Sequence, residues 1–400
     1  MSLHFKETPP VLNKYLEPYK KALTKPQRAH FTIFIAGLIT NDKKTIQEIN
    51  DSASKKNQSS LNRSVTRWDI EQLNDIRLSQ AQRMLPTRND GLLIIDNTLA
   101  HKTGRHMEGA GMHRSGITKR KEWGHNIVNS YYVYPGWKFG YPITADIFTN
   151  KDNPDYPYHP IKRMALEQVR YARAHGVKGI VCADSLFYAD YVVQELDGEH
   201  ERYLLGVPST LKISVARTLR VSVLEHFKHE RFERVDIRGR SYHISSVRAS
   251  IRGVGTRRII CSYLDEHEDD KKFYLTNLNY PNKKLMDLLA SRWQIECWHR
   301  DAKQHLGFED YQVRKDRAVR NVVLAVLIAY TILVLSQLHK TLRRVAKHIE
   351  RQFQTIGELC RFMRLAAKHR WHWVTRMMRD HMETFKDILN REVLVKNAKV

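Results

Sequence analysis

Two short apolar runs that each end in an aspartate constrain the fold of this chain most strongly. The first is GLLIIDNT (91–98), with Asp96 near its end, and the second is VKGIVCADS (177–185), with Asp184 near its end. Short continuous apolar runs are typical of strands that are buried on both faces of a parallel sheet. Because the carboxyl ends of neighbouring parallel strands meet at one edge, we expect the two aspartates to lie together there.

The segments around these runs alternate between strand and helix patterns. After the first run we expect a loop at 101–124 that is rich in Gly, His and Lys, and then two strands joined by a turn at Pro135 and Gly136. Helical spacing follows at 161–176, then the second run, another helix and a strand at 203–208. This order resembles that of a ribonuclease H-like fold.

The remaining segments predict further domains. Residues 234–263 alternate apolar and basic residues with glycines between them, which favours an inserted antiparallel β region. Helical periodicity fills the first 85 residues and returns near Leu285. We therefore expect a multidomain α/β protein, with a mixed sheet that carries helices on both faces. The expected parts are a helical DNA-binding domain (1–85), the first part of a catalytic core (86–209), a β-rich insertion (210–278), the last part of the core (279–340) and a helical C-terminal region (341–400).

One segment of the amino-terminal region has a helix-turn-helix pattern. Between Lys43 and Trp68, apolar Ile46, Ile49, Leu61 and Val65 are spaced to face inward, and basic and amide residues separate them. In a helix-turn-helix the second helix enters the major groove of DNA. A helical hairpin with a solvated basic face explains the same pattern equally well.

The charge of the chain indicates its partner. The 67 Lys and Arg residues against 43 Asp and Glu residues give a formal net charge of +24, while 42% hydrophobic and 10% aromatic residues exclude a disordered chain. A folded protein with this excess is expected to bind a polyanion, either nucleic acid or an anionic membrane surface.

An apolar segment at 322–335 bears on the membrane alternative. Its 14 residues are fewer than the roughly 18 to 20 that a spanning helix needs. We therefore expect a buried core helix and no membrane partner. The amino terminus lacks the apolar core of a signal peptide and the four cysteines form no regular pattern, which favours a reducing cytoplasmic location.

The predicted helix near residue 290 carries a charged face. Arg292, Glu296 and Lys303 are spaced four and seven residues apart, about one and two helical turns, so they project from one side of the helix. An acid between two bases suits one metal ligand that lies beside two phosphate contacts.

Asp96, Asp184 and Glu296 together resemble the catalytic triad of the DDE-class insertion-sequence transposases that have a β insertion before the glutamate. In that group the glutamate lies in a signature of Tyr, two residues, Arg, three residues, Glu, six residues and Lys. This chain matches at Arg292, Glu296 and Lys303, whereas Leu289 stands at the Tyr position and removes one phosphate-contacting hydroxyl.

The resemblance implies a DNA transposase, with two Mg²⁺ or Mn²⁺ ions held by Asp96, Asp184 and Glu296. Such an enzyme binds the terminal inverted repeats of its element, cleaves the ends and transfers the 3′ strands to target DNA, as a homodimer on DNA near the prokaryotic nucleoid. Arg292 and Lys303 would contact phosphates. Further expected DNA contacts are Lys55, Lys56, Arg63, Lys102 and Arg105.

Two alternatives share these residues. A metal-dependent nuclease without strand transfer needs the same three acids. A DNA-binding regulator derived from a transposase would keep the fold without the reaction, and the presence of all three acids disfavours it.

Overall fold

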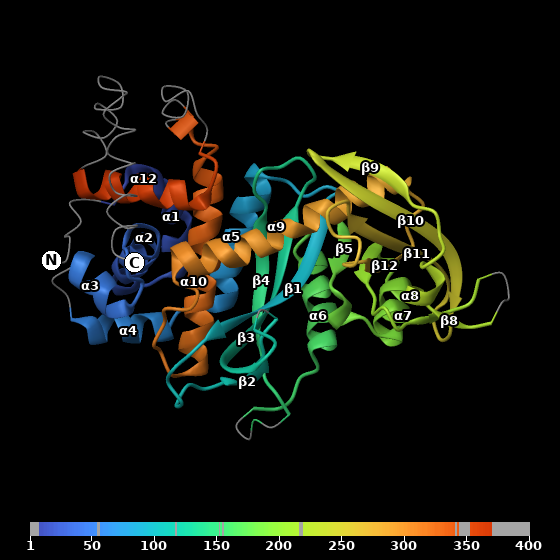
Figure 1. Cartoon of the computed structure of the whole chain (residues 1–400). Coiled ribbons are helices and arrows are strands. Elements are labelled where there is room, and N and C mark those ends of the chain that lie inside the picture. Colours follow the sequence, from blue (N-terminus) through green and yellow to red (C-terminus); the bar gives the residue numbers. More distant parts are fainter. Residues whose placement is uncertain are drawn as a thin grey trace. The chain divides into compact units, whose positions relative to one another are not determined.

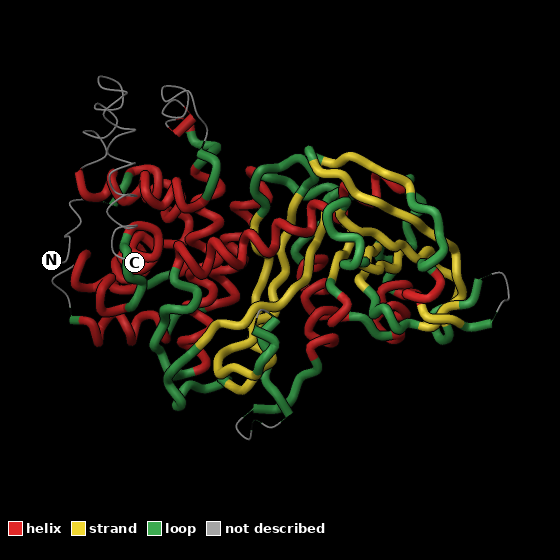
Figure 2. Tube along the Cα trace, viewed as in Figure 1, coloured by secondary structure: helices red, strands yellow, loops and turns green. Residues whose placement is uncertain are grey.

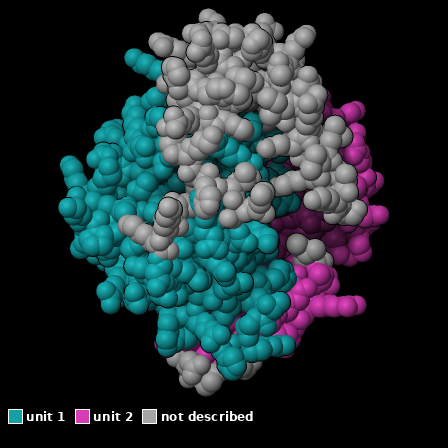
Figure 3. All heavy atoms as spheres, turned by 90° about the vertical axis from the view of Figure 1, so that its left-hand side faces the viewer, with its two compact units in different colours: residues 1–84, 100–108, 299–400 teal, residues 85–99, 109–298 magenta. Residues whose placement is uncertain are grey.

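The computed structural model describes residues 8–53, 57–116, 118–151, 153, 156–215, 219–340, 342–343 and 353–369. Its helices and strands are shown in Figures 1 and 2. The chain divides into two compact units, coloured separately in Figure 3. The first unit comprises Met1–Met84, Ala100–Glu108 and His299–Val400, and the second comprises Leu85–Leu99 and Gly109–Trp298.

The first unit is helical. Its described helices are α1 (Pro10–Leu16), η1 (Glu17–Ala22), α2 (Lys25–Thr40), α3 (Ile46–Ala53), α4 (Gln58–Thr66), α5 (Ile70–Met84), α10 (Asp316–Ser336) and α12 (Ile356–His369). Their starts follow from local sequence. Thr24 and Gln27 form a capping box at the start of α2, and the Asn57 side chain accepts a hydrogen bond from the backbone N–H of Ser59 to cap α4.

Helix α10 forms the core of this unit, and α1, α2, α4, α5 and α12 pack against it. It is long and apolar enough to cross a membrane by length and composition, but 94% of its most apolar window is buried inside the protein. The described helix has 21 residues, against the 14 of the apolar run. Buried polar contacts fix its neighbours, because Tyr15 donates to the Leu335 carbonyl at 2.9 Å and Asn321 donates to the Val65 carbonyl at 2.8 Å. Helix α10 is thus the buried core helix that its apolar run predicts.

Helices α2, α3 and α4 pack on one another within the first unit. Ile49, Leu61 and Val65 are buried, as the apolar spacing predicts, whereas Ile46 is only partly buried. Arg63 is exposed on α4. Lys55 and Lys56, which follow α3 in the sequence, lie outside the described residues.

The second unit contains one large sheet, one small sheet and several helices. The strands are β1 (Leu92–His101), β2 (Gly111–Arg114), β3 (Lys121–Val133), β4 (Tyr141–Phe148), β5 (Ile180–Ala183), β6 (Tyr203–Gly206), β7 (Lys212–Ile213), β8 (Val221–Ser222), β9 (Glu233–Ile237), β10 (Arg240–Ile251), β11 (Gly255–Leu264) and β12 (Lys272–Thr276). The helices are α6 (Ile161–Ala174), η2 (Ser185–Phe187), α7 (Asp190–Gly198), α8 (Val223–His226) and the first part of α9 (Asn282–Leu306).

The ten-stranded sheet has the order β2-β3-β1-β5-β6-β12-β11-β10-β9, with β4 paired to β3. Strand β5 runs parallel to β1 and to β6, whereas β12 is antiparallel to β6. The two apolar runs of the sequence are therefore neighbouring parallel strands. The mixed sheet with helices confirms the expected α/β, ribonuclease H-like architecture.

Two features of this sheet differ from the simplest expectation. Most of the β-rich segment after β6 continues the central sheet, because β12 pairs with β6 and β9 to β12 extend that sheet, while β7 and β8 form the small sheet. The segment 101–124, expected to be a loop, contains β2, and β3 already begins at Lys121. Strand β2 has four residues, among them Gly111, His113 and Arg114, so it shows no apolar run from which it could be predicted.

Each face of the sheet has its own helices. Residues in register on neighbouring strands share a face of the sheet, so Ile94, Cys182 and Leu204 lie on one face. Residues two positions further along each strand lie on that same face. The opposite face carries α7, because Arg257 of β11 pairs with Asp197 of that helix. Helix α6 packs against β3 and β4.

Candidate active site

The two aspartates predicted from the apolar runs lie where the pairing of β1 with β5 ends. Asp184 directly follows β5, whereas β1 continues to His101, so Asp96 does not end its strand as the apolar run predicts. The paired register of these strands ends at Ile95 and Ala183, and the next residues along are Asp96 and Asp184. The Asp96 carboxylate accepts from the backbone N–H of Asn97 at 2.9 Å. Asp184 caps the short helix η2 by accepting from the backbone N–H of Ser185. Backbone donors thus orient both carboxylates at one edge of the sheet.

Helix α9 supplies the third carboxylate. Glu296 and Arg292 are one turn apart on it, and an Arg292 Nη atom lies 3.2 Å from a Glu296 Oε atom. Their side chains are 34% and 22% exposed. Since the Arg292 charge also acts on Asp96, on Cys182 and on Tyr274, α9 crosses the sheet face that carries these residues.

The three carboxylates repel one another. Burial raises the pKa of Asp96 to about 7; Arg292 and the Asn97 N–H oppose this shift, and the charges of Asp184 and Glu296 add to it. Burial also raises the pKa of Glu296, partly offset by Arg292, and Asp184 adds to the rise. A cluster of this kind holds unfavourable negative charge that a cation would relieve.

The donor set has the chemistry of a hard-cation site. Three carboxylates offer oxygen ligands, which Mg²⁺ and Mn²⁺ prefer. Within the described part of the chain, however, no three His, Cys, Asp or Glu side chains are arranged closely enough to hold a metal ion as they stand. The side chains therefore fit a divalent cation by type and by electrostatic need, in an open arrangement in which Arg292 engages one oxygen of Glu296.

The lysine of the charged face, Lys303, lies two turns beyond Glu296 in the part of α9 that belongs to the first unit. Its ammonium pairs with the Glu309 carboxylate at 2.8 Å. The predicted phosphate contact is therefore an ion pair within the protein in this structure.

Lys102, also in the first unit, likewise contacts groups of the protein itself. Its ammonium donates to the carbonyls of Glu309 and Tyr311 at 2.6 and 3.2 Å, and it lies 3.2 Å from the centroid of the Tyr311 ring. Burial lowers the pKa of Lys102 to about 7, although Glu309 and Asp310 oppose the shift. These contacts favour a structural role for Lys102 over the predicted contact with DNA.

The other predicted DNA contacts are surface residues or lie outside the described chain. Arg105 and Arg63 are exposed, the latter on α4. Lys55 and Lys56 lie outside the described residues, so their assignment stays a prediction.

Two further residues, Gly206 and Asn126, support the site, and the sequence patterns did not predict them. A Cβ at Gly206 of β6 would lie 2.6 Å from the Ser185 nitrogen, so only glycine there lets the Asp184 turn approach β6. Asn126 of β3 accepts from the side-chain amide of Asn97 at 2.8 Å and fixes the residue beside Asp96. In the sequence, only the glycine that ends the apolar run YLLG indicates the close approach of the Asp184 turn to β6.

Comparison with known proteins agrees with this geometry. The family profile described as Transposase DDE domain matches residues 90–332, which is more than half of the chain and includes all three carboxylates. No curated protein matches the chain significantly.

Proposed function

Because the chain belongs to the DDE transposase family, we propose that it binds the terminal inverted repeats of a mobile DNA element, cleaves the ends and joins the 3′ strands to target DNA. The observation that carries the proposal is the meeting of Asp96, Asp184 and Glu296 on one face of the sheet, where their charges interact. Family membership gives the transposase-type nuclease activity, and the details of end recognition and strand transfer are the proposal.

Asp96, Asp184 and Glu296 would hold the divalent metal ions that DDE transposases typically use. When bound, such ions activate the attacking oxygen and stabilise the leaving oxygen of an in-line displacement at phosphorus. In the first reaction a water oxygen bonds to phosphorus while the bond to the 3′ oxygen breaks, which leaves a 3′ hydroxyl. In the second, that hydroxyl attacks a phosphodiester of the target and displaces another 3′ oxygen.

Residues of the chain itself orient the carboxylates and offset part of their negative charge. The N–H groups of Asn97 and Ser185 hold the two aspartates in place. Arg292 holds Glu296 and supplies a fixed positive charge beside Asp96, which suits it to a phosphate oxygen of the reacting strand. A second protomer is proposed because two element ends must be handled together.

The test begins with inverted repeats in the DNA that flanks the reading frame, which provide the duplex for the assay. With Mg²⁺ the protein should nick this duplex at the repeat end and yield joined products with a second duplex. Glu296→Gln should lower both rates by about 10³-fold or more and leave binding of the duplex intact.

Asp287→Asn is the matched control, because Asp287 is a carboxylate on the same helix whose partner is Arg238. It should retain cleavage. Cleavage by Glu296→Gln at the wild-type rate would remove Glu296 from the site, and cleavage without joined products would favour the nuclease alternative.

A further inference from the structure

Two arginines face each other across β10 and β11. Arg248 and Arg258 are direct partners in the antiparallel register, so their side chains lie on the same face. Like charges in this position destabilise a sheet. Within the described residues, the hydrogen bonds of Arg258 go to neutral groups only, and neither arginine forms an ion pair with a carboxylate. The pair thus costs stability without an internal counter-charge.

Arg258 is fixed by four hydrogen bonds to neutral acceptors. Its Nε and Nη2 atoms donate to the Ser246 hydroxyl at 3.1 and 2.9 Å, Nη2 also donates to the Asn282 side chain at 2.7 Å, and Nη1 donates to the Tyr280 carbonyl at 2.5 Å. Burial and the charge of Arg248 lower the pKa of Arg258. Its charge is therefore held rigidly at the start of α9 and is not neutralised.

The next residue along the chain provides a contrast. Arg257 points to the opposite face, where it donates to the Asp197 carboxylate and to the Tyr203 hydroxyl. The protein thus supplies an acid to the arginine on one face and none to the two on the other. The missing counter-charge is specific to the face that carries the three catalytic carboxylates.

The neighbours of the arginine pair are hydrogen-bond donors. Ser250 and Thr256 form the next pair along the two strands on the same face, and both are exposed, as is Arg248. The Glu233 carboxylate, from the adjacent strand, accepts from the Asn282 amide instead. Guanidinium and hydroxyl groups side by side are the chemistry that proteins use to bind a backbone phosphate.

The distance from this pair to the carboxylates follows from the sheet register. Arg258 is in register with Thr276, then Leu204, then Cys182 and Ile94, the residue two before Asp96. Four steps of about 4.8 Å between strands give about 19 Å for Arg258, and the fifth step, to Arg248 on β10, gives about 24 Å. Along α9, the 14 residues from Asn282 to Glu296 give about 21 Å at 1.5 Å per residue. The two routes agree.

We propose that Arg248, with Arg258 fixed beside it, binds a backbone phosphate of duplex DNA about 20 to 24 Å, or roughly six to seven base pairs, from the phosphodiester that reacts at the three carboxylates. The proposal rests on the proposed function and adds an anchoring point to it. Because a phosphate carries no base identity, the contact sets the position of the duplex and not the recognised sequence.

The first experiment measures the binding of a fluorescent repeat-end duplex at several salt concentrations. Arg248→Gln should weaken binding severalfold and reduce the slope of log K against log salt by about 0.9, the value for one phosphate contact. Arg240→Gln is the matched control, because Arg240 is exposed on the same strand, eight residues or about 27 Å away. It should leave the slope close to that of wild type.

The second experiment locates the contact. Neutral methylphosphonate linkages are placed singly along the duplex. One position, about six to seven base pairs from the cleaved bond, should weaken binding by wild type and by Arg240→Gln but not by Arg248→Gln.

The outcomes separate this proposal from the proposed function. The anchoring site is wrong, and the transposase proposal stands, if wild type binds and cleaves the duplex but Arg248→Gln has an unchanged salt slope. The same conclusion follows if every neutral linkage that weakens binding by wild type also weakens binding by Arg248→Gln. If wild type does not bind the repeat-end duplex, both fail.

Discussion

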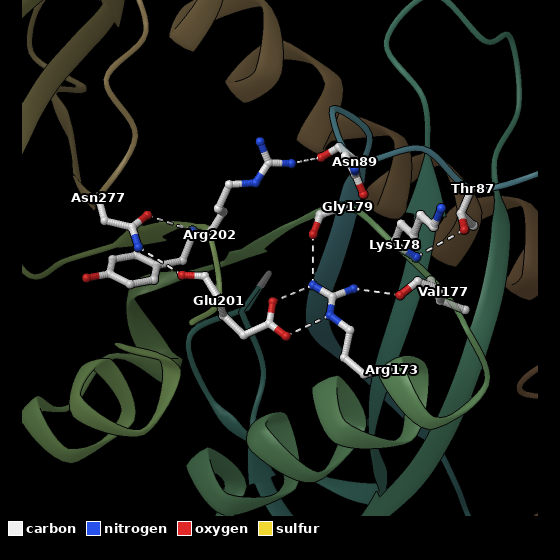
Figure 4. A network of polar contacts seen from close by, with 10 residues as sticks. Thr87, Asn89, Arg173, Val177, Lys178, Gly179, Glu201, Arg202 and Asn277 are labelled. Carbon is white, nitrogen blue, oxygen red and sulfur yellow. Dashed lines mark hydrogen bonds and ion pairs between the residues drawn. The ribbon is translucent and has the colours of Figure 1, made fainter. Parts of the chain in front are cut away.

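The two ends of the parallel strands β1, β5 and β6 are opposites in the way they treat charge. At the amino ends, Arg173 forms a two-pronged ion pair with Glu201 at 2.6 and 2.7 Å and donates to the carbonyls of Val177 and Gly179, as Figure 4 shows. At the carboxyl ends, three carboxylates repel one another and Arg292 balances them only in part. The charged groups at the amino ends are paired within the protein. At the carboxyl ends a negative charge remains that a bound cation would balance.

The amino-end network extends beyond this pair. The Asn277 amide donates to the Glu201 carbonyl at 2.8 Å, and its oxygen accepts from the Tyr203 N–H at 3.1 Å, while the Lys178 N–H donates to Thr87 at 3.0 Å. Figure 4 shows these groups together with Arg202, which reaches the Asn89 carbonyl. Every contact joins the start of one strand to another segment, so this end stabilises the sheet.

The comparison predicts the largest stability loss at the amino end. Arg173→Met should lower the free energy of unfolding by about 3 kcal/mol, because it leaves the Glu201 carboxylate, 12% exposed, without its partner. Urea denaturation measures the loss. Adding Glu201→Gln should restore part of it, since no charge then remains unpaired. A loss below about 0.5 kcal/mol would mean that this end does not hold the sheet together.

At the carboxyl end the sign should reverse. Asp96→Asn should stabilise the metal-free protein by about 2 kcal/mol at pH 8, because burial and the neighbouring charges disfavour the carboxylate. The folded pKa of about 7 lies above the ordinary aspartate value of 3.8, so the folded state binds more protons and wild-type stability falls as the pH rises from about 4 to 7.

Urea denaturation at pH 4 and pH 8 with a chelator tests this reversal. The two proteins should be equally stable at pH 4 and should diverge by pH 8, and Mg²⁺ should stabilise wild type more than the variant. A variant that is less stable than wild type at pH 8 would break the comparison.

The smallest effect is expected at the margin of the network. Asn277→Ala should cost about 1 kcal/mol, because two hydrogen bonds at an exposed position are replaced by bonds to water. Hydrogen exchange at the Tyr203 N–H should rise, whereas exchange at the Ser185 N–H, at the other end of the sheet, should not. Equal changes at both ends would show that the ends are not independent.

The sequence predicted the parts of the site that depend on local periodicity. The apolar runs before Asp96 and Asp184 identified two buried strands, and the spacing of Arg292 and Glu296 placed both on one helix face. These features require only the periods of strand and helix.

The parts that depend on distant pairing were not predictable in this way. Strands β6 and β12 pair across more than sixty residues, and no local pattern encodes that the insertion continues the central sheet. The sequence positions of Lys102 and Lys303 suggested phosphate contacts. In the structure the Lys102 ammonium donates to the Glu309 carbonyl and the Lys303 ammonium pairs with the Glu309 carboxylate. Long, flexible basic side chains acquire their partners only from the tertiary structure.

The pairing of β6 with β12 also joins segments that are synthesised at different times. The carboxylates stand at residues 96, 184 and 296, and the β6–β12 pairing lies between the second and the third along the chain. Domains fold during synthesis from the amino terminus onward. A ribosome-bound chain that ends at Leu264 therefore carries two of the three acids and neither Arg292 nor Glu296. With the active site proposed above, we expect such a fragment to lack DNA cleavage activity.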